Sequence, residues 1–138
     1  MAGSVTQSIS YTQNPTIRVL KFVCTGDAAN GSIPDTAISA AILAEIEGHY
    51  FYTASAYPTA GGTAPDAADV QIVDANGEDL LGGKGINLIH ATAKQTVFPY
   101  SAFQTENYAP AVINNLTMKV ANQATPSANY TIELVFAR

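Results

Sequence analysis

Strict alternation of apolar and polar side chains near the end of the sequence is the feature that most constrains its fold. Two segments carry this alternation, residues 113–122 and 129–138. Successive side chains of a β-strand point to opposite faces, so each segment is typical of a strand with one face on a core and one in water. The apolar faces carry Leu116, Met118 and Val120 in the first segment, and Tyr130, Ile132, Leu134 and Phe136 in the second. A short polar connector joins them, which predicts an antiparallel hairpin.

Further short strands, separated by turn residues, are predicted along the rest of the sequence. They are rich in β-branched and aromatic residues, and the one interrupted by three glycines is expected to bend. The predicted strands are 16–25, 49–57, 69–73 and the bent segment 80–92, and residues 94–112 are expected to form a long aromatic-bearing loop. Residues 1–15 are interpreted as an N-terminal arm or edge strand. We therefore expect an all-β, mainly antiparallel fold, a single β-sandwich or jelly-roll-like domain over 16–138.

One segment departs from the strand pattern and predicts a short helix. Three isoleucines within residues 34–48 recur every four positions, which aligns them on one stripe of a helix; they are Ile38, Ile42 and Ile46. Asp35 or Thr36 can serve as the N-cap, and Gly48 stands where a glycine ends many helices. We expect one short helix near 36–47 that covers one end of the β structure.

Charge and hydropathy argue against several classes of partner. The net charge is −5, and the six Lys and Arg residues are scattered rather than arranged in a stripe that could follow a phosphate backbone. No apolar run approaches the ~20 residues that span a bilayer, and the first residues lack the basic and apolar regions of a signal peptide. We therefore expect no nucleic-acid partner, no membrane partner, and assembly in a cytoplasm.

Candidate catalytic residues are few and isolated from one another. His49 and His90 are the only histidines, and Cys24 lies in an apolar strand-like segment that predicts a buried thiol. Nucleophilic catalysis and zinc binding both require such residues in groups. The GGKG segment, 82–85, lacks the spacing of a phosphate-binding loop, and there is no tryptophan to stack on a sugar. We predict a non-enzymatic protein with no catalytic residue, cofactor or metal.

The stretch DVQIVDANGEDLLGG, residues 69–83, is crowded with oxygen-bearing side chains, among them Asp69, Asp74, Asn76, Glu78 and Asp79. The order of residues only loosely resembles an EF-hand loop, because the glycine comes early and the terminal glutamate is absent. Asn76-Gly77 is instead a dipeptide favoured in type I′ hairpin turns. The stretch therefore predicts a turn, and a weak calcium site at 74–79 stays open as the alternative.

Three segments of the sequence together resemble small virion structural proteins of tailed bacteriophages. They are IPDTAISAAILAEIEGHYFYTASAYP, GGTAPDAADVQIVDANGEDLLGG and NLTMKVANQATPSANYTIELVFAR, which lie within residues 33–138. The shared pattern is a helix-like segment followed by an aromatic strand, an Ala-Pro-Asp loop, an Asp-x-x-Gly-x-Asp turn before Gly-Gly, and a final alternating hairpin. The resemblance implies a non-enzymatic role in a phage particle.

Within that class, the resemblance points to a capsid decoration, or cement, protein on the outer capsid surface. The implied partner is the major capsid protein, and the implied oligomer is a homotrimer. The alternative is a tail, baseplate or fibre-associated module, including a receptor-binding one. We expect the N-terminal arm and exposed aromatic residues to make the contacts, because aromatic side chains are favoured interface anchors; the alternative for the loop aromatics is that they cover the domain's own core. The candidate interface residues are Tyr11, Tyr100, Phe103 and Tyr108.

Overall fold

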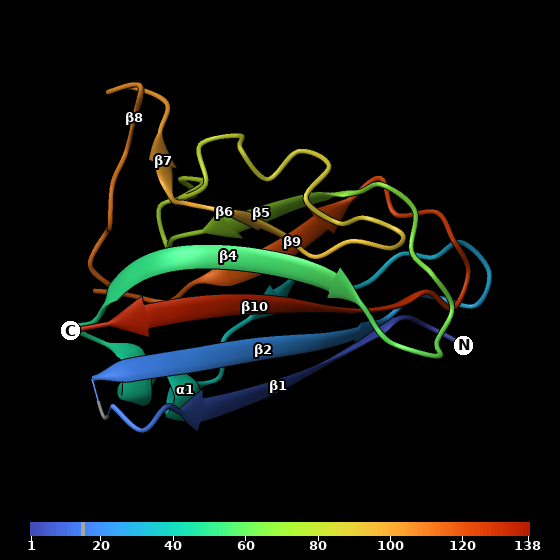
Figure 1. The fold of residues 1–138 in the computed structure, drawn as a ribbon, viewed down its shortest axis with the longest axis horizontal. Helices are drawn as coiled ribbons and strands as arrows, with labels where there is room; N and C mark the ends of the chain where they lie inside the picture. The colour runs from blue at the N-terminus through green and yellow to red at the C-terminus, as the bar shows by residue number, and fades with distance from the viewer. Residues whose placement is uncertain (15) are drawn as a thin grey trace.

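Two antiparallel sheets packed face to face make up most of the computed structural model, which describes residues 1–14 and 16–138 (Figure 1). The larger sheet has the order β1-β2-β10-β4-β6 and the smaller one β3-β9-β5, and every pairing is antiparallel. The larger sheet comprises β1 (Ser4–Tyr11), β2 (Ile17–Thr25), β4 (Tyr50–Pro58), β6 (Gln95–Val97) and β10 (Asn129–Ala137). The smaller comprises β3 (Thr36–Ala37), β5 (Asp69–Val73) and β9 (Thr117–Ala121). The predicted all-β sandwich is confirmed.

The core lies between the two sheets and is formed by the faces that the alternation predicts. The even-numbered residues of β10 and Leu20, Phe22 and Cys24 of β2 are fully buried, and Phe136 of β10 lies 5.3 Å, centroid to centroid, from Phe51 of β4. Met118 of β9 belongs to the same buried cluster from the opposite sheet. Burial of large apolar side chains is the main stabilising contribution to such a fold.

The predicted pairing of the last two strands is wrong. β9 pairs with β3 and β5, whereas β10 pairs with β2 and β4 in the other sheet. Alternation shows which face of a strand is buried but does not identify its neighbour. The connector, residues 122–128, therefore carries the chain from one sheet to the other, and the two apolar faces meet across the core.

The helix is shorter than the sequence predicts. α1 spans Ala40–Ile46, and its N-cap is Ser39, whose Oγ accepts a hydrogen bond from the Ile42 backbone N–H. Thr36, an expected N-cap, belongs to β3, because residues 36–37 pair with β9. The apolar stripe is confirmed, since all three isoleucines are buried. Gly48 has a φ of +84°, the left-handed conformation that a helix-ending glycine supplies.

Residues 80–92 do not form the predicted bent strand. They form a series of turns, tied to the sheet by isolated bridges between Val73 and Asp79 and between Ala68 and Ile89. Gly82 and Gly83 both adopt positive φ, which is incompatible with a strand. The expected long loop at 94–112 in turn contains β6 and a small hairpin of β7 (Tyr100–Ser101) and β8 (Glu106–Asn107). The described part of the chain contains no helix that could span a membrane.

Candidate interaction surface

The three aspartates of the 69–83 stretch accept hydrogen bonds from the protein's own backbone. Asp74 Oδ1 accepts hydrogen bonds from the N–H groups of Asn76 and Glu78, at 2.9 and 3.0 Å. Asp69 Oδ1 accepts from the Asn87 N–H at 2.8 Å. Within residues 1–14 and 16–138, no group of three or more His, Cys, Asp or Glu residues is placed to hold a metal ion.

The turn itself differs from the predicted type I′. Gly77 has a φ of +87°, but Asn76 is not among the described residues with positive φ. The Gly77 N–H donates to the Asp74 carbonyl at 3.0 Å, and the Asp74 N–H donates to the Glu78 carbonyl at 3.0 Å. These bonds describe a type I turn followed by a left-handed glycine, the other common hairpin connection. The Asp74 carboxylate favours this form because it also holds the backbone of the turn.

His49 and Cys24 are buried parts of the core region rather than a reactive pair. His49 is 3% exposed, and its ring nitrogens make no hydrogen bond of good geometry among the described residues. Burial lowers the pKa of His49, and the charges of Arg138 and Arg18 lower it further, while backbone groups of nearby residues offset part of the effect. Burial raises the pKa of the Cys24 thiol to about 12, so the thiol is held in its unreactive form.

Acidification is expected to destabilise the fold through His49. Because its pKa in the folded state is lowered, the unfolded chain takes up the proton first as the pH falls through the ordinary histidine value of about 6.5. We expect the melting temperature to fall between about pH 7.5 and about pH 5, and this fall to be smaller in His49→Gln. Differential scanning calorimetry at both pH values measures it, and an equal fall in both proteins would contradict the assignment.

Six of the nine exposed large apolar side chains among the described residues lie toward one end of the sandwich. The strand register brings four strand ends together: the end of β1, the start of β2, the end of β10 and the start of β4. Tyr11 pairs with Arg18, Arg18 pairs with Phe136, and Phe136 pairs with Phe51. The end of β6 reaches the same region through the Val97–Ala54 pair, and an isolated bridge joins Tyr50 to Ala111. Figure 1 shows the β7–β8 hairpin projecting beyond the sheets at this end. We call this surface the aromatic end; it comprises Tyr11, Tyr50, Tyr52, Phe98, Phe103 and Ile113.

The four residues predicted from sequence lie in two places at this end of the sandwich, and two of them, Tyr11 and Phe103, belong to the aromatic end. Tyr100, Phe103 and Tyr108 belong to the β7–β8 hairpin and its exit, where the Tyr108 N–H donates to the Pro99 carbonyl at 3.1 Å. Tyr11 lies on β1, at the opposite edge of the larger sheet from β6. Its hydroxyl donates to Glu45 Oε2 at 2.8 Å, and that bond and partial burial raise its pKa.

The members of the hairpin group differ strongly in exposure. Phe103 is 92% exposed, whereas Tyr100 and Tyr108 are partly buried. The Lys84 ammonium lies 4.5 Å from the centre of the Tyr100 ring, a cation–π contact. Burial raises the pKa of Tyr108, and the acidic turn at 74–79 raises it further. Tyr100 and Tyr108 therefore support the hairpin, and Phe103 is the side chain that it presents to solvent.

Sequence reasoning did not select the other exposed apolar residues of the aromatic end. Tyr50 and Tyr52 flank the buried Phe51 in β4, so the alternation of the strand could have indicated that they face outward. Ile113 is 76% exposed, and it begins the alternating segment 113–122, four residues before β9. Phe98 follows β6.

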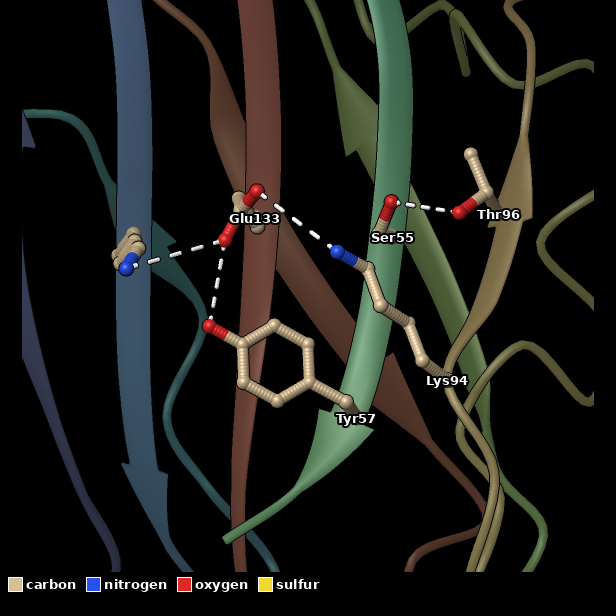
Figure 2. Close-up of polar contacts among 6 residues, drawn as sticks. Ser55, Tyr57, Lys94, Thr96 and Glu133 are labelled. Carbon is tan, nitrogen blue, oxygen red and sulfur yellow. Dashed lines mark hydrogen bonds and ion pairs between the residues drawn. The ribbon is translucent and has the colours of Figure 1, made fainter. Parts of the chain in front are cut away.

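A polar network covers the middle of the outer face of the larger sheet (Figure 2). The Glu133 carboxylate on β10 accepts a hydrogen bond from the Tyr57 hydroxyl at 3.2 Å and lies 3.9 and 4.0 Å from the ammonium groups of Lys21 and Lys94. The Lys94 ammonium also lies 5.2 Å from the centre of the Tyr57 ring. Register alone places Glu133 between Lys21 on β2 and Ser55 on β4. The charged groups are thus paired within the sheet.

The outer face of the smaller sheet carries an open pocket of about 330 Å³. Its lining includes the carboxylates of Asp69 and Asp79, but both accept hydrogen bonds from backbone N–H groups. Asp35, also in the lining, lies 3.7 Å from the Lys119 ammonium. The pocket therefore holds carboxylates that are already engaged, not a pair facing each other across a substrate.

The fold and its surfaces define an antiparallel β-sandwich with exposed apolar side chains concentrated at one end. No protein family and no curated protein matches the chain. Among solved structures, it is similar to the N-terminal CBM22-1–CBM22-2 tandem domain of Xyn10C from Paenibacillus barcinonensis, at 10% identity and a TM-score of 0.38. That match covers 99% of this chain and 41% of the other, so the chain spans less than half the length of that structure. Values this low carry no inference about function.

Proposed function

We propose that this protein is a non-enzymatic structural protein of a phage virion that binds the outer capsid shell and stabilises it. The sequence resemblance provides the class of protein, and the aromatic end provides a surface through which it could bind. Asp69 and Asp74 hold backbone turns, and His49 and the Cys24 thiol are buried, which supports a binding role rather than a catalytic one.

The exposure of Phe103 is the observation that carries this proposal. It lies between two strands of only two residues each, and 92% of its surface is in water. A phenylalanine in that position contributes nothing to the core, whereas its burial against a partner would remove a large apolar area from water. Aromatic side chains at the centre of an interface commonly dominate its binding energy.

Shell stabilisation follows from binding that favours the assembled particle. A protein that binds the shell but not its dissociated subunits stabilises the shell by the free energy of that binding. Many symmetry-related copies add their contributions, so a modest contact at each site is sufficient. The major capsid protein is the proposed partner, and the order of the homo-oligomer on the shell, for which the resemblance implies three, stays a prediction.

Replacing Phe103 by serine is expected to weaken binding to the shell by about 10- to 100-fold, the effect of losing an aromatic anchor. Its exposure means that the melting temperature should stay unchanged. Particles of the encoding phage that lack the protein are mixed with the purified variant, and occupancy is measured after sedimentation. Ile86→Ser is the control, because Ile86 is 66% exposed but lies over the smaller sheet.

Wild-type occupancy of the shell by Phe103→Ser would contradict the role of the aromatic end. Electron cryomicroscopy of the intact particle tests the location separately. Density for the sandwich on the head supports the capsid proposal, and density on the tail or baseplate favours a tail-associated module instead.

A further inference from the structure

The outer edge of β1 is an unpaired strand edge along its whole length. β1 pairs with β2 from Ser4 opposite Thr25 to Tyr11 opposite Arg18, with no register shift. It is the terminal strand of the larger sheet, and Figure 1 shows no strand beyond it. Among the described residues, the backbone hydrogen bonds of β1 all run to β2. Alternate N–H and C=O groups therefore face outward without a protein partner.

This edge lacks the features by which proteins usually block strand addition. Such features are charged side chains, proline, a bulge, or a very short strand. Residues 2–17 contain no Asp, Glu, Lys, Arg or His, and β1 contains no proline. Its eight residues pair without a bulge. The edge is therefore open to another strand along a length that exceeds that of most strands.

β1 is also held rigidly enough to act as a template. Val5 and Ile9 pack against the core from its inner face. Gln7 is fixed at both ends of its amide, because Nε2 donates to the Ala37 carbonyl at 2.9 Å and Oε1 accepts from the Ser39 N–H at 3.0 Å. A second strand could bind this edge with little ordering of β1 itself, which lowers the entropic cost of association.

We propose that β1 pairs with β1 of a second copy of this chain, antiparallel, with Gln7 of one strand directly opposite Gln7 of the other across a twofold axis. Residues directly opposite each other in an antiparallel pair lie on the same face of the sheet, so one residue must lie opposite its own copy. Centring on Gln7 places Val5 opposite Ile9 on the inner face, an apolar pair beside the core. Centring on Ser8 would instead place Ile9 opposite the amide of Gln7.

A second copy fits this edge because the edge is complementary to itself. Twofold pairing brings each side chain of β1 close to the same strand of the other copy, so a charged residue would meet its own like charge nearby and destabilise the pair, but β1 carries no charge. The outer face opposes Thr6 to Ser8 and Ser4 to Ser10, hydroxyl pairs that can exchange hydrogen bonds across the strands. The contact is isologous and closes at two copies, so it predicts a dimer, whereas the resemblance implies a trimer.

The oligomeric mass of the isolated protein tests this proposal without any capsid. Light scattering and sedimentation equilibrium, up to the highest soluble concentration, should show a monomer of 14.4 kDa in equilibrium with a particle of twice that mass. A strand pair buries little surface, so we expect weak association. Ser8→Lys should abolish the dimer, because the lysines of the two chains would lie near each other across the paired strands and repel. Asn76→Lys adds the same charge to an exposed turn and should leave the dimer unchanged.

A chain that stays monomeric, one that forms trimers, or a dimer unaffected by Ser8→Lys would overturn the proposal. Cysteines then test the register. Equal amounts of Thr6→Cys and Ser8→Cys, oxidised together, should give mainly the mixed disulfide, because residues 6 and 8 face each other. Two Ser8→Cys chains would be diagonal neighbours roughly 7 to 8 Å apart, beyond the reach of a disulfide. Predominance of that homodisulfide in the mass spectrum would refute centring on Gln7. Cys24 is fully buried and should not compete.

Discussion

Gly85→Ala is expected to lower the free energy of unfolding by roughly 3 kcal/mol or more, at the upper end of the cost of overpacking. A Cβ on residue 85 would lie 1.9 Å from the carbonyl oxygen of Val70 on β5. A hydrogen bond from the Val70 N–H to the Gly85 carbonyl, at 2.9 Å, holds the two backbones close together. Relief of the clash therefore requires the turn series at 80–92 to move away from the sheet. Denaturation by urea, followed by circular dichroism, measures the loss.

Gly83→Ala is the matched control for this clash. Gly83 lies two residues away and has a φ of +84°, but a Cβ there would meet no atom within 4 Å. Its replacement should cost only the left-handed backbone penalty of about 1–2 kcal/mol. If both variants lost the same free energy of unfolding, the close approach to Val70 would not be the reason that residue 85 must be glycine.

The sequence predicts burial in this fold better than it predicts pairing. The alternation in β9 and β10 correctly indicates the faces that carry Met118 and Phe136. It does not indicate that the two strands lie in different sheets, because a strand that faces a core has the same pattern whichever strand lies beside it. The partner of a strand depends on contacts distant in sequence, such as that of β10 with β2.

Two predictions failed, those for the start of the helix and for the glycine-rich segment 80–92, because another local structure formed in place of the predicted one. Thr36 and Ala37 could continue a helix, but they pair with β9 and so delay the helix until Ser39. In the 80–92 segment, apolar side chains such as Leu81 suggested a strand, and Leu81 is indeed fully buried. The run of glycines allowed a chain of turns to bury it instead, and short apolar segments do not distinguish the two.

The exposure of individual aromatic side chains was the property of the candidate surface that was hardest to predict from sequence. Phe103, Tyr100 and Tyr108 all carry aromatic rings, yet only Phe103 is almost fully exposed. The difference arises because the hairpin folds back, so that the Tyr100 N–H donates to the Leu80 carbonyl at 3.0 Å. Such a contact joins segments twenty residues apart, and no local pattern indicates it.

Asp79→Ala is expected to lower the free energy of unfolding by about 2–4 kcal/mol. The Asp79 carboxylate accepts three backbone hydrogen bonds, from Ile72 at 3.3 Å, Leu81 at 3.0 Å and Gly83 at 3.0 Å. It thereby joins β5 to the first turns of the 80–92 segment. Hydrogen bonds to a charged group contribute more than neutral ones, and partly buried donors left without an acceptor carry a further cost. The same urea denaturation measures the change.

Two further variants show whether these hydrogen bonds are the reason. Asp79→Asn keeps one oxygen, which can still accept from Ile72 and Leu81, but turns an N–H₂ group toward the Gly83 N–H, so we expect an intermediate loss. Glu78→Ala removes an exposed neighbouring carboxylate and should change the stability by less than about 0.5 kcal/mol. If Glu78→Ala were as damaging as Asp79→Ala, negative charge in the turn would matter rather than the bonds of Asp79. If the stability losses follow the predicted order, with Asp79→Ala largest and Glu78→Ala smallest, the role of Asp79 in this acidic stretch is to hold the glycine turns against β5.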